Sequence, residues 1–598
     1  MLYPKESETR EVKDLSGVWK FKVDYDNIGR KQEWNKFPLD KNVIEMPVPS
    51  SYNDITQDSN IRDHIGDVWY ERFFFVPSHW NNRRIALRIG SATHKAAVWI
   101  NGKYLGEHKG GYLPFEFDIT NLLELGGENR VTIVVNNVLD WSTLPPGYIR
   151  EFQDEMHPPG YKVQEYFHDY FNYSGIHRPV KLHSMPTNYI DDLTISTEIE
   201  GNFGLVNYEV KVVGKQHEVK VSLLDKREKE ICVHNGLKGI LKIEDPKLWE
   251  PGNAYLYSLK IETSIDNRIE DIYRQDVGIR TVEVKGNHFL LNGKPFYFRG
   301  FGKHEDVDLR GKGLDHVTNV KDFNLMDWVG ANSFRTSHYP YSEEILKLAD
   351  ERGIVVIDEA PAVGMRFHDD DPISGPVFCD EHISEETLQY HLNVMRDFIN
   401  RDKNHPCVVL WSVANEAMTK EDGAFHYFKR VIEETRRLDS TRPVTIVEYI
   451  GPKDNRVGYL ADVLCINRYF GWYSDCGKLD LIEYQLEKEL NAWYEKFKKP
   501  IIITEYGADA VTGFHQDPPV MFTEEFQKEF LDRYHRVFDK MDFIIGEHIW
   551  SFADFATKQH IRRVVGNRKG VFTRQRQPKM AAYLLKERWT PSSKNKKT

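Results

Sequence analysis

Eight short apolar segments alternate with helical segments in the second half of the chain, beginning near Phe289. They lie at 296–300, 331–335, 354–358, 407–412, 444–448, 463–467, 500–504 and 543–550. Between them, 342–352 and 484–497 place apolar residues at helical spacing. Eight parallel strands, each followed by a helix, form a closed (β/α)8 barrel. The sequence therefore predicts a TIM barrel over residues 285–598.

Residues 1–284 show a different pattern, in which short alternating strands are separated by Gly, Pro and Asn-Gly turns. Runs such as 69–76 and 130–135 are typical of an all-β sandwich, which we expect over 1–185. Asn101-Gly102 predicts a tight hairpin, because a type I′ turn needs positive φ at both central residues. A second series of short strands predicts a smaller, immunoglobulin-like sandwich over 186–284.

The charge balance and the apolar runs argue against two classes of partner. The chain has 80 Lys and Arg against 91 Asp and Glu, a net charge of −11, so we expect no nucleic acid partner. Runs such as 354–357 and 407–411 are far shorter than the roughly 18 residues of a membrane-spanning helix. No apolar signal core follows Met1, so we predict a cytoplasmic protein with no membrane partner.

The five cysteines give no sign of metal or redox chemistry. Cys232, Cys379, Cys407, Cys465 and Cys476 are odd in number and irregularly spaced, without the close pairs of zinc or disulfide-exchange sites. We therefore interpret all five as free thiols. Cys407 and Cys465 lie within apolar runs and are expected to be buried.

Polar and aromatic residues follow most of the predicted barrel strands. In a TIM barrel, the residues after each strand gather at one face, where barrel enzymes place their active sites. Seven of the eight strands here end in such residues: 303–306, 336–340, 358–359, 415–416, 467–469, 505–506 and Trp550. One such ending would carry little information, but seven predict a site at this face.

Glu416 and Glu505 each end an apolar strand, which partly removes them from water. A carboxylate in such a place needs a partner or a proton. Two carboxyl groups flanking an acetal are the minimum apparatus of a glycosidase, since one protonates the leaving oxygen and the other attacks or stabilises the anomeric carbon. The alternative is a structural role for both. Their positions along the strands leave both interpretations open.

Three segments at this face resemble the signatures of glycoside hydrolase family 2. They are Trp-Ser-Val-Ala-Asn-Glu at 411–416, Ile-Thr-Glu-Tyr-Gly at 503–507 and Arg-Thr-Ser-His-Tyr-Pro at 335–340. The likeness extends over essentially the whole chain, through 171–178 to 567–570. Within the family it is to the β-glucuronidases. The resemblance implies a jelly-roll, sugar-binding-like first sandwich, an immunoglobulin-like second sandwich and a catalytic barrel.

The resemblance also implies roles in a retaining double displacement. Glu416 would be the general acid/base and Glu505 the nucleophile, with their carboxyl groups about 5 to 5.5 Å apart. Asn415 suits the sugar 2-hydroxyl, and Tyr469 can donate to Glu505 and keep it ionised. Asn467, in the same motif as Tyr469, is expected to contact the sugar.

Residues 562–570 concentrate four cations in an acidic chain, next to the predicted site. A neutral sugar needs no such cluster. A uronic acid carries a carboxylate, and each charge-assisted hydrogen bond to it is worth about 1.5 to 3 kcal/mol. By resemblance, Asn567 and Lys569 hold this carboxylate, while Tyr473 and Arg563 provide further sugar contacts. The alternative for the run is a solvated basic face.

Three further candidates keep two interpretations each. Asp169, in the first sandwich, reaches a sugar hydroxyl by resemblance, or it caps a local turn. His338 contacts the substrate or only orients a loop. Trp550 stacks on the sugar face or packs against the barrel, and packing is also open to Trp472.

The loop after the third predicted strand, 362–384, falls where the family carries a lid of variable length, so the resemblance does not transfer an aglycone preference. The run His368–Asp371 contains residue types that bind metals. Adjacent aspartates in a Pro- and Gly-containing loop are, however, more typical of a solvated turn. We predict no metal and no organic cofactor.

Several rival functions keep part of this pattern. A β-galactosidase or β-mannosidase of the same architecture would keep both glutamates and lose the carboxylate pocket, whereas a β-galacturonidase would keep the pocket. A metal-dependent barrel hydrolase predicts paired histidines one residue apart after the first strand, and 303–305 lacks them. A noncatalytic carbohydrate-binding protein need not retain both carboxyl groups.

We expect small-molecule glucuronides or glucuronate-terminated saccharides as substrates, and a homodimer or homotetramer.

Overall fold

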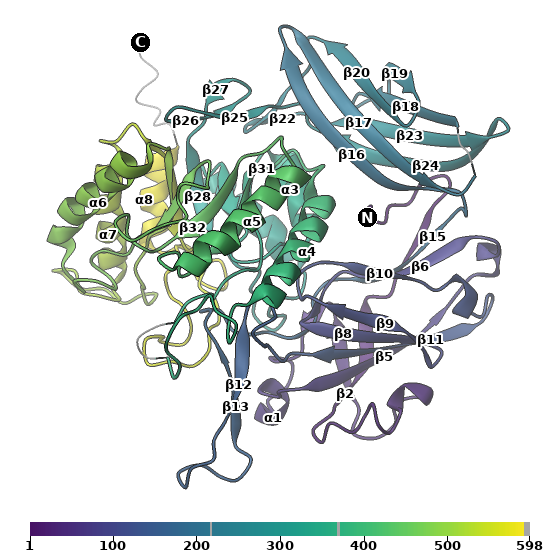
Figure 1. Ribbon diagram of the computed structural model, residues 1–598, viewed down its shortest axis with the longest axis horizontal. Coiled ribbons are helices and arrows are strands. Elements are labelled where there is room, and N and C mark those ends of the chain that lie inside the picture. Colours follow the sequence, from purple (N-terminus) through teal and green to yellow (C-terminus); the bar gives the residue numbers. More distant parts are fainter. Residues whose placement is uncertain (216–217, 368–370, 591–598) are drawn as a thin grey trace.

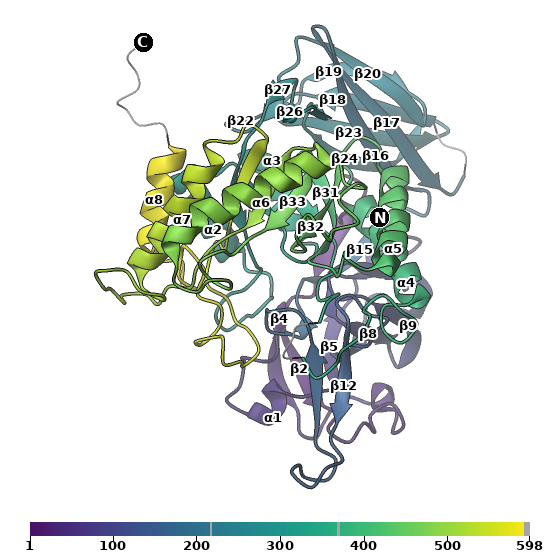
Figure 2. The ribbon, with the colours of Figure 1, turned by 60° about the vertical axis from the view of Figure 1, so that its left-hand side comes forward.

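The computed structural model describes residues 1–215, 218–367 and 371–590. Figure 1 shows a purple and dark-blue β-sandwich, a second, lighter blue sandwich and a green and yellow barrel. The view in Figure 2 shows the first sandwich below and the second above, on one side of the barrel. The predicted combination of two sandwiches and a barrel is confirmed.

The first sandwich packs a six-stranded sheet against a four-stranded sheet, and both are antiparallel. The larger sheet has the order β3 (Ile44–Val48), β2 (Gly17–Val23), β5 (Asp67–Phe75), β11 (Glu128–Asn136), β8 (Lys95–Ile100) and β9 (Lys103–Lys109). The smaller has the order β1 (Glu11–Asp14), β15 (Val180–Met185), β6 (Arg84–Ile89) and β10 (Phe115–Asp118). Alternate residues of both sheets fill one core, with Trp19, Tyr70 and Leu182 fully buried.

The predicted hairpin turn is present between β8 and β9. Asn101 has φ 51° and Gly102 has φ 78°, the left-handed values that a type I′ turn requires. The side-chain Oδ1 of Asn101 also accepts a hydrogen bond from the backbone N–H of Arg130 at 2.8 Å. The short sequence signal therefore located this turn correctly.

Several short elements of the first sandwich lie outside its two main sheets. They are α1 (Ser59–Arg62), the ribbon β4 (Ser50–Ser51), β14 (Gly175–Ile176) and β7 (Ala92–Thr93), and the hairpin β12 (Gly147–Glu151) and β13 (Lys162–Tyr166). The segment after β13 crosses to the barrel, where Tyr170 bridges Thr557 and the Phe171 amide donates to Ala556 O at 2.9 Å. This crossing carries Asp169 to the barrel mouth.

The second sandwich is smaller and has its own core around Val221, Leu259 and Tyr273. One sheet has the order β16 (Tyr189–Glu200), β17 (Phe203–Val213) and β20 (Lys238–Glu244). The other has the order β19 (Glu230–Asn235), β18 (Glu218–Leu224), β23 (Tyr257–Ile265) and β24 (Arg268–Val277). Two ribbons lead into the barrel: β21 (Trp249–Glu250) with β22 (Asn253–Ala254), and β25 (Val282–Lys285), β26 (His288–Leu291) and β27 (Lys294–Pro295).

Eight parallel strands close into the predicted barrel. They are β28 (Phe298–Gly302), β29 (Ser333–Arg335), β30 (Val355–Glu359), β31 (Val408–Asn415), β32 (Val444–Glu448), β33 (Leu464–Asn467), β34 (Ile501–Glu505) and β35 (Ile544–Trp550). From β29 to β35 every strand residue is buried, because helices cover the outside and side chains fill the inside. Each strand lies within about three residues of its predicted position. The largest difference is β31, which continues past Ser412 to Asn415.

The helices around the barrel are α2 (His316–Val329), α3 (Glu343–Arg352), α4 (Glu385–Asp402), α5 (Asp422–Leu438), α6 (Ile482–Phe497), α7 (Glu524–Phe538) and α8 (Met580–Trp589). The prediction of helices at 342–352 and 484–497 is confirmed by α3 and α6. In α3, Glu343 lies in the first turn and Arg352 in the last, which suits the helix dipole, and Gly353 ends the helix with φ 70°.

Two further predictions concern the cysteines and membrane-spanning helices. All five cysteines are free, and Cys407 and Cys465 are buried, as predicted. Among the residues that the structure describes, no helix is long and apolar enough to cross a membrane.

Arg178 joins the first sandwich to the barrel. Its buried guanidinium donates to Glu305 Oε2 at 3.2 Å, to Pro340 O at 2.7 Å and to Tyr112 O at 2.6 Å. Glu305 follows β28 and is itself largely buried. This ion pair therefore fixes the first sandwich, and with it the segment that carries Asp169, against the mouth of the barrel.

We predict that Arg178→Met lowers the free energy of unfolding by about 3 to 5 kcal/mol, because it leaves the Glu305 carboxylate buried without its cation. Urea denaturation followed by tryptophan fluorescence measures the loss. The matched control is Arg150→Met, since Arg150 is an exposed cation 3.9 Å from Glu165 and should contribute less than about 1 kcal/mol. Equal, small losses in the two variants would contradict the structural role of Arg178.

Candidate active site

The last residues of the eight barrel strands converge on one face. In chain order they are Gly302, Arg335, Glu359, Asn415, Glu448, Asn467, Glu505 and Trp550. Parallel strands of a closed barrel point in one direction, so their carboxyl ends meet around a single opening. Six of the eight residues are polar or charged and buried, which is a costly arrangement unless they bond one another.

Arg335 is the centre of this network. Its guanidinium is fully buried, and Nη1 donates to both carboxylate oxygens of Glu359 at 2.7 and 2.8 Å, while Nη2 donates to Glu505 Oε1. The Ser412 hydroxyl also donates to Glu359, at 2.7 Å. One cation therefore connects three strands, β29, β30 and β34.

Glu505 has two further neighbours on the barrel face. The Tyr469 hydroxyl donates to its Oε2 at 2.7 Å, which is the contact expected from the sequence. His338 Nε2 lies 3.8 Å from Oε1. Both carboxylate oxygens of Glu505 are thus in contact with other side chains, which come from β29 and the segments that follow β29 and β33.

The pKa of Glu505 departs from the expectation that Tyr469 keeps this group ionised. Burial raises the pKa of Glu505 to about 8; Arg335 opposes the rise, the nearby Glu416 carboxylate adds to it, and Tyr469 lowers it. Because the two glutamates interact, this value describes the release of one proton from the pair. The two carboxyl groups therefore oppose each other's ionisation.

Glu416 immediately follows β31 and has φ 51°, a left-handed conformation that is unusual outside glycine. Its amide donates to Val447 O at 2.8 Å, which fixes the turn. Asn467 Nδ2 donates to Glu416 Oε1 at 2.8 Å, and Arg366 pairs with Oε2. The Thr504 hydroxyl donates to Asn467 Oδ1 at 2.8 Å, so the Asn467 amide can only present its nitrogen to Glu416.

Asn415 lies between the two glutamate networks. Its Oδ1 accepts long hydrogen bonds from Arg335 Nη1 at 3.4 Å and from Asn467 Nδ2 at 3.3 Å. The side chain is buried at the barrel mouth. It therefore contacts one residue of each network, Arg335 and Asn467, and lies next to Glu416 in the chain.

A second cluster contains four of the residues expected to bind the sugar. Asp169 accepts from Arg563 Nε through Oδ1 and from Asn567 Nδ2 through Oδ2, both at 2.8 Å. Arg563 Nη2 also donates to the Tyr473 hydroxyl at 2.9 Å. Asp169 comes from the first sandwich, so the site is built by two domains. A role limited to capping a local turn does not account for these contacts.

Lys569 is fully buried beside this cluster. Its Nζ donates to Asp509 Oδ2 at 3.0 Å and lies 4.9 Å from the Trp472 ring centroid and 4.8 Å from that of Tyr473. The ammonium is also 6.0 Å from the ring of Tyr469, whose hydroxyl bonds Glu505. Lys569 therefore faces the same aromatic wall as Glu505, and the solvated basic face considered for this segment does not describe its position.

His338 and Trp550 form one side of the opening. Their rings stack at 5.0 Å between centroids with an interplanar angle of 22°, and Arg335 lies 5.9 Å from the Trp550 centroid. Burial lowers the pKa of His338, so the imidazole is neutral near pH 7. His338 Nδ1 also lies 3.1 Å from Glu359 Oε1. Both residues thus border the network around Glu505.

Four residues of the two clusters were not singled out from the sequence. Arg335 and Glu359 end their strands within the polar endings that the sequence analysis noted, and that position could have identified them. Arg366 and Asp509 lie in irregular segments with no periodic signal. Their roles depend on contacts with residues far away in the chain.

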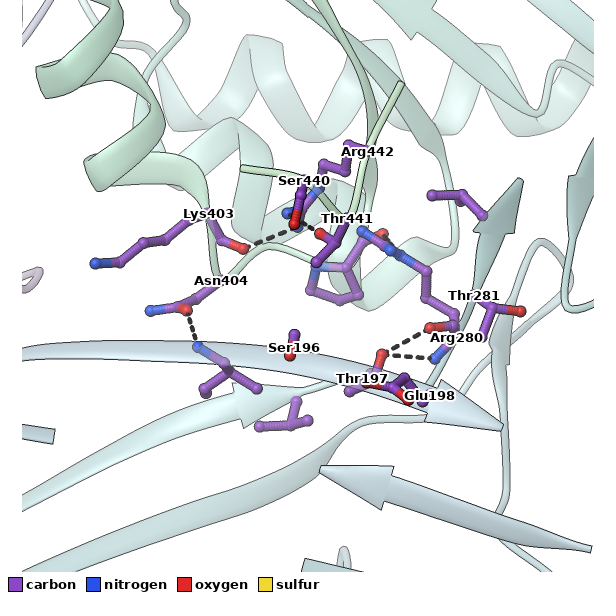
Figure 3. Close-up of a pocket in the computed structure, with 15 residues that line it drawn as sticks. Ser196, Thr197, Glu198, Arg280, Thr281, Lys403, Asn404, Ser440, Thr441 and Arg442 are labelled. Atoms are coloured by element: carbon purple, nitrogen blue, oxygen red, sulfur yellow. Dashed lines mark hydrogen bonds between the residues drawn. The ribbon is translucent and has the colours of Figure 1, made fainter. Parts of the chain in front are cut away.

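Two cavities lie away from this opening, between the second sandwich and the barrel. The one in Figure 3 has a volume of about 270 Å³, and a neighbouring one about 580 Å³. Arg280 lines the first and donates to the carbonyl oxygens of Pro406 and Val408. Neither cavity includes the glutamate pair, so these cavities are not the candidate active site.

Among the described residues, one group could supply three metal ligands, namely Asp350, His405 and Cys407. Asp350 already accepts from His405 Nδ1 at 2.5 Å and from the Cys407 amide at 2.9 Å. This group precedes β31, at the opposite end of that strand from Glu416. Residues 368–370, which make up most of the His368–Asp371 run, lie outside the described residues.

Family comparisons agree with the three-part architecture. Residues 12–186 match the sugar binding domain of glycosyl hydrolases family 2, residues 188–280 match a further model of that family, and residues 282–593 match its TIM barrel domain.

Similar proteins extend over the whole chain. A β-glucuronidase of Paenibacillus borealis is 58% identical over 98% of both chains, and one of Homo sapiens is 47% identical over 98% of this chain and 92% of its own. The solved β-D-glucuronidase of Dictyoglomus thermophilum has 56% identity and a TM-score of 0.94, covering 99% of both chains. A Ruminococcus gnavus β-glucuronidase in complex with uronic isofagomine has 40% identity and a TM-score of 0.94, covering 98% of this chain and 99% of that one.

The coupling between the two glutamates can be measured directly. We predict that Glu416→Gln lowers the pKa of Glu505 from about 8, since it removes the neighbouring carboxylate that raises it. Carbon-13 NMR of labelled glutamate carboxyl groups follows the titration. Glu448→Gln is the control, because Glu448 is a buried strand-end glutamate that bonds Thr419. An unchanged Glu505 titration in Glu416→Gln would show that the two groups are not coupled.

Proposed function

The chain belongs to glycosyl hydrolases family 2, and on that premise we propose that it hydrolyses β-D-glucuronides to glucuronic acid and the free aglycone. The observation that carries the proposal is the position of Tyr469. Its hydroxyl bonds Glu505, and its ring lies 6.0 Å from the Lys569 ammonium. A nucleophilic carboxylate and a cation able to bind a sugar carboxylate thus share one wall.

In the first step, Glu505 attacks the anomeric carbon while Glu416 protonates the glycosidic oxygen. The C–O bond to the aglycone breaks, and a covalent glycosyl-enzyme forms on Glu505. The single proton of the glutamate pair supplies this need, because one carboxyl group must be neutral while the other is charged. Arg335 and Tyr469 hold the attacking carboxylate in a fixed orientation.

In the second step, Glu416 acts as a base toward water. It accepts a proton from the water that attacks the anomeric carbon, and the bond to Glu505 breaks with retention of configuration. Asn467 donates to Glu416 and keeps its orientation between the two steps. Asn415, beside both glutamates, supplies a hydrogen bond to the sugar 2-hydroxyl, which strengthens in the transition state.

The proposed carboxylate pocket consists of Lys569 and Asn567, with Arg563, Tyr473 and Asp169 binding other sugar groups. Lys569 and Asn567 are buried, and each charged member of the pocket already has a partner. Desolvated charge-assisted hydrogen bonds of this kind select a carboxylate over the neutral hydroxymethyl group of glucosides and galactosides. The similar Ruminococcus gnavus β-glucuronidase forms a complex with uronic isofagomine, which supports a site for a uronic ligand. His338 and Trp550 would form the wall on which the sugar lies.

A β-galacturonidase is the second candidate, because an epimeric uronic acid carries the same carboxylate. Hydrolysis rates on nitrophenyl β-D-glucuronide, β-D-galacturonide and β-D-galactoside distinguish the three activities. We expect the glucuronide to have the highest kcat/KM. A preference for the galactoside would contradict the proposed carboxylate pocket.

Three broader assignments are also part of the proposal. The domains extend over 1–185, 186–284 and 285–598, which the family matches at 12–186, 188–280 and 282–593 support. The enzyme works in the cytoplasm and forms a homodimer or homotetramer. Light scattering after size-exclusion chromatography measures the oligomeric state.

We predict that Lys569→Met lowers kcat/KM for glucuronides by about tenfold or more, equivalent to about 1.4 kcal/mol of transition-state binding. Activity on a neutral glycoside should change much less. Because the change leaves Asp509 buried without its cation, the control is the double variant Lys569→Met/Asp509→Asn, which removes both charges. Equal losses on acidic and neutral sugars would contradict the carboxylate assignment.

The shared proton predicts a pH dependence. Above about pH 8 the glutamate pair loses its proton, so no acid remains for the leaving group, and kcat/KM should fall about tenfold per pH unit. A pH profile with methyl β-D-glucuronide, whose poor leaving group needs the acid, measures this limb. In Glu416→Gln, assayed with an activated leaving group that needs no acid, the alkaline limb should be absent.

A further inference from the structure

The backbone before Arg366 is fixed beside Glu416. The Asn415 amide donates to Ala362 O, and the Met418 amide donates to Met365 O, both at 3.0 Å. Residues 362–365 therefore run along the turn that carries Glu416. Arg366 is the next residue, so its side chain starts from a fixed position at the barrel mouth.

The Arg366 guanidinium contacts Glu416 from the side opposite Asn467. Its Nη1 pairs with Oε2, whereas Asn467 occupies Oε1. The guanidinium also lies 4.6 Å from the ring centroid of Tyr449. Burial, the largest single effect, lowers the pKa of Arg366, but Glu416 together with Tyr449 and Glu505 outweighs burial, so the pKa is raised. One fifth of the side chain is exposed, so the cation still faces the opening.

This contact helps only one of the two steps proposed for Glu416. A guanidinium beside a carboxyl group favours the ionised form over the neutral acid. The ionised form is the base of the second step, but the first step needs the acid. A group that draws Arg366 away from Glu416 would therefore favour cleavage of the glycosidic bond.

The leaving group is the part of the substrate that reaches Arg366. Glu416 must lie within hydrogen-bonding distance of the glycosidic oxygen to protonate it, so a side chain bonded to Glu416 borders the aglycone. The sugar carboxylate is already accounted for by Lys569 and Asn567. An anionic group close to the glycosidic oxygen would pair with Arg366 and release Glu416.

We propose that Arg366 determines aglycone specificity and favours glucuronides whose leaving group carries a carboxylate or sulfate near the glycosidic oxygen, as in acidic saccharides. This inference rests on the proposed function. Arg366 lies next to the reacting groups without taking part in bond making. Its effect should appear as a preference between leaving groups that differ in charge.

The test compares two substrates that differ in one charge, 2-carboxy-4-nitrophenyl β-D-glucuronide and its methyl ester. Leaving-group reactivity differs between them, but this difference cancels when the acid-to-ester ratio of kcat/KM is compared between variants. We expect Arg366→Met to lower that ratio by about tenfold or more. Arg366→Lys, which keeps the charge, should stay within about threefold of the original ratio.

Lys420→Met is the matched control. Lys420 is an exposed cation four residues after Glu416, so its removal changes the charge of the mouth without touching Glu416. Its ratio should not change. An unchanged ratio in Arg366→Met, with both substrates still cleaved, would overturn the inference and leave the proposed function intact.

Two other outcomes are also decisive. If the unsubstituted enzyme cleaves neither glucuronide, the proposed function fails first. If Arg366→Met does not fold, as judged by its melting temperature, Arg366→Gln supplies the same comparison. A ratio in Arg366→Gln equal to that of the unsubstituted enzyme would overturn the inference.

Discussion

The buried guanidinium of Arg335 holds the candidate site together. It neutralises Glu359 and orients Glu505 at the ends of three barrel strands, in a place where water cannot solvate any of them. Removing one partner would leave an uncompensated charge in the interior, which costs several kcal/mol. The rest of the site is built around this pairing, since Tyr469 and His338 both approach the carboxylate that Arg335 holds.

The barrel and the location of its site could be predicted from the sequence because both follow from local patterns. An apolar run of five to eight residues gives each strand, and the common direction of parallel strands brings their ends together. Glu505 and Trp550 therefore needed only a strand assignment to be placed. The extension of β31 beyond Ser412 was missed because Val413 and Ala414 continue the strand where the pattern already resembled an active-site loop.

The pairings inside the site could not be predicted, because they join residues that are distant in the chain. Asp169 and Arg563 are 394 positions apart, and only the crossing of the first sandwich to the barrel brings them together. Arg366 lies in a segment without periodicity, so no local pattern shows that it reaches Glu416. The left-handed φ of Glu416 also has no sequence signal, since the residue is not glycine.

The same pairings change how the cluster of basic residues at 562–570 is understood. In isolation the run suggests a surplus of positive charge, yet Lys569 faces Asp509 and Arg563 faces Asp169. Under the proposed function, a substrate carboxylate would enter a pocket whose cations already have partners, so long-range attraction would contribute little to its binding. Selectivity would then come from the fixed directions of the remaining N–H groups of Lys569 and Asn567. A neutral sugar would be bound less well, because it offers no charged acceptor for these hydrogen bonds.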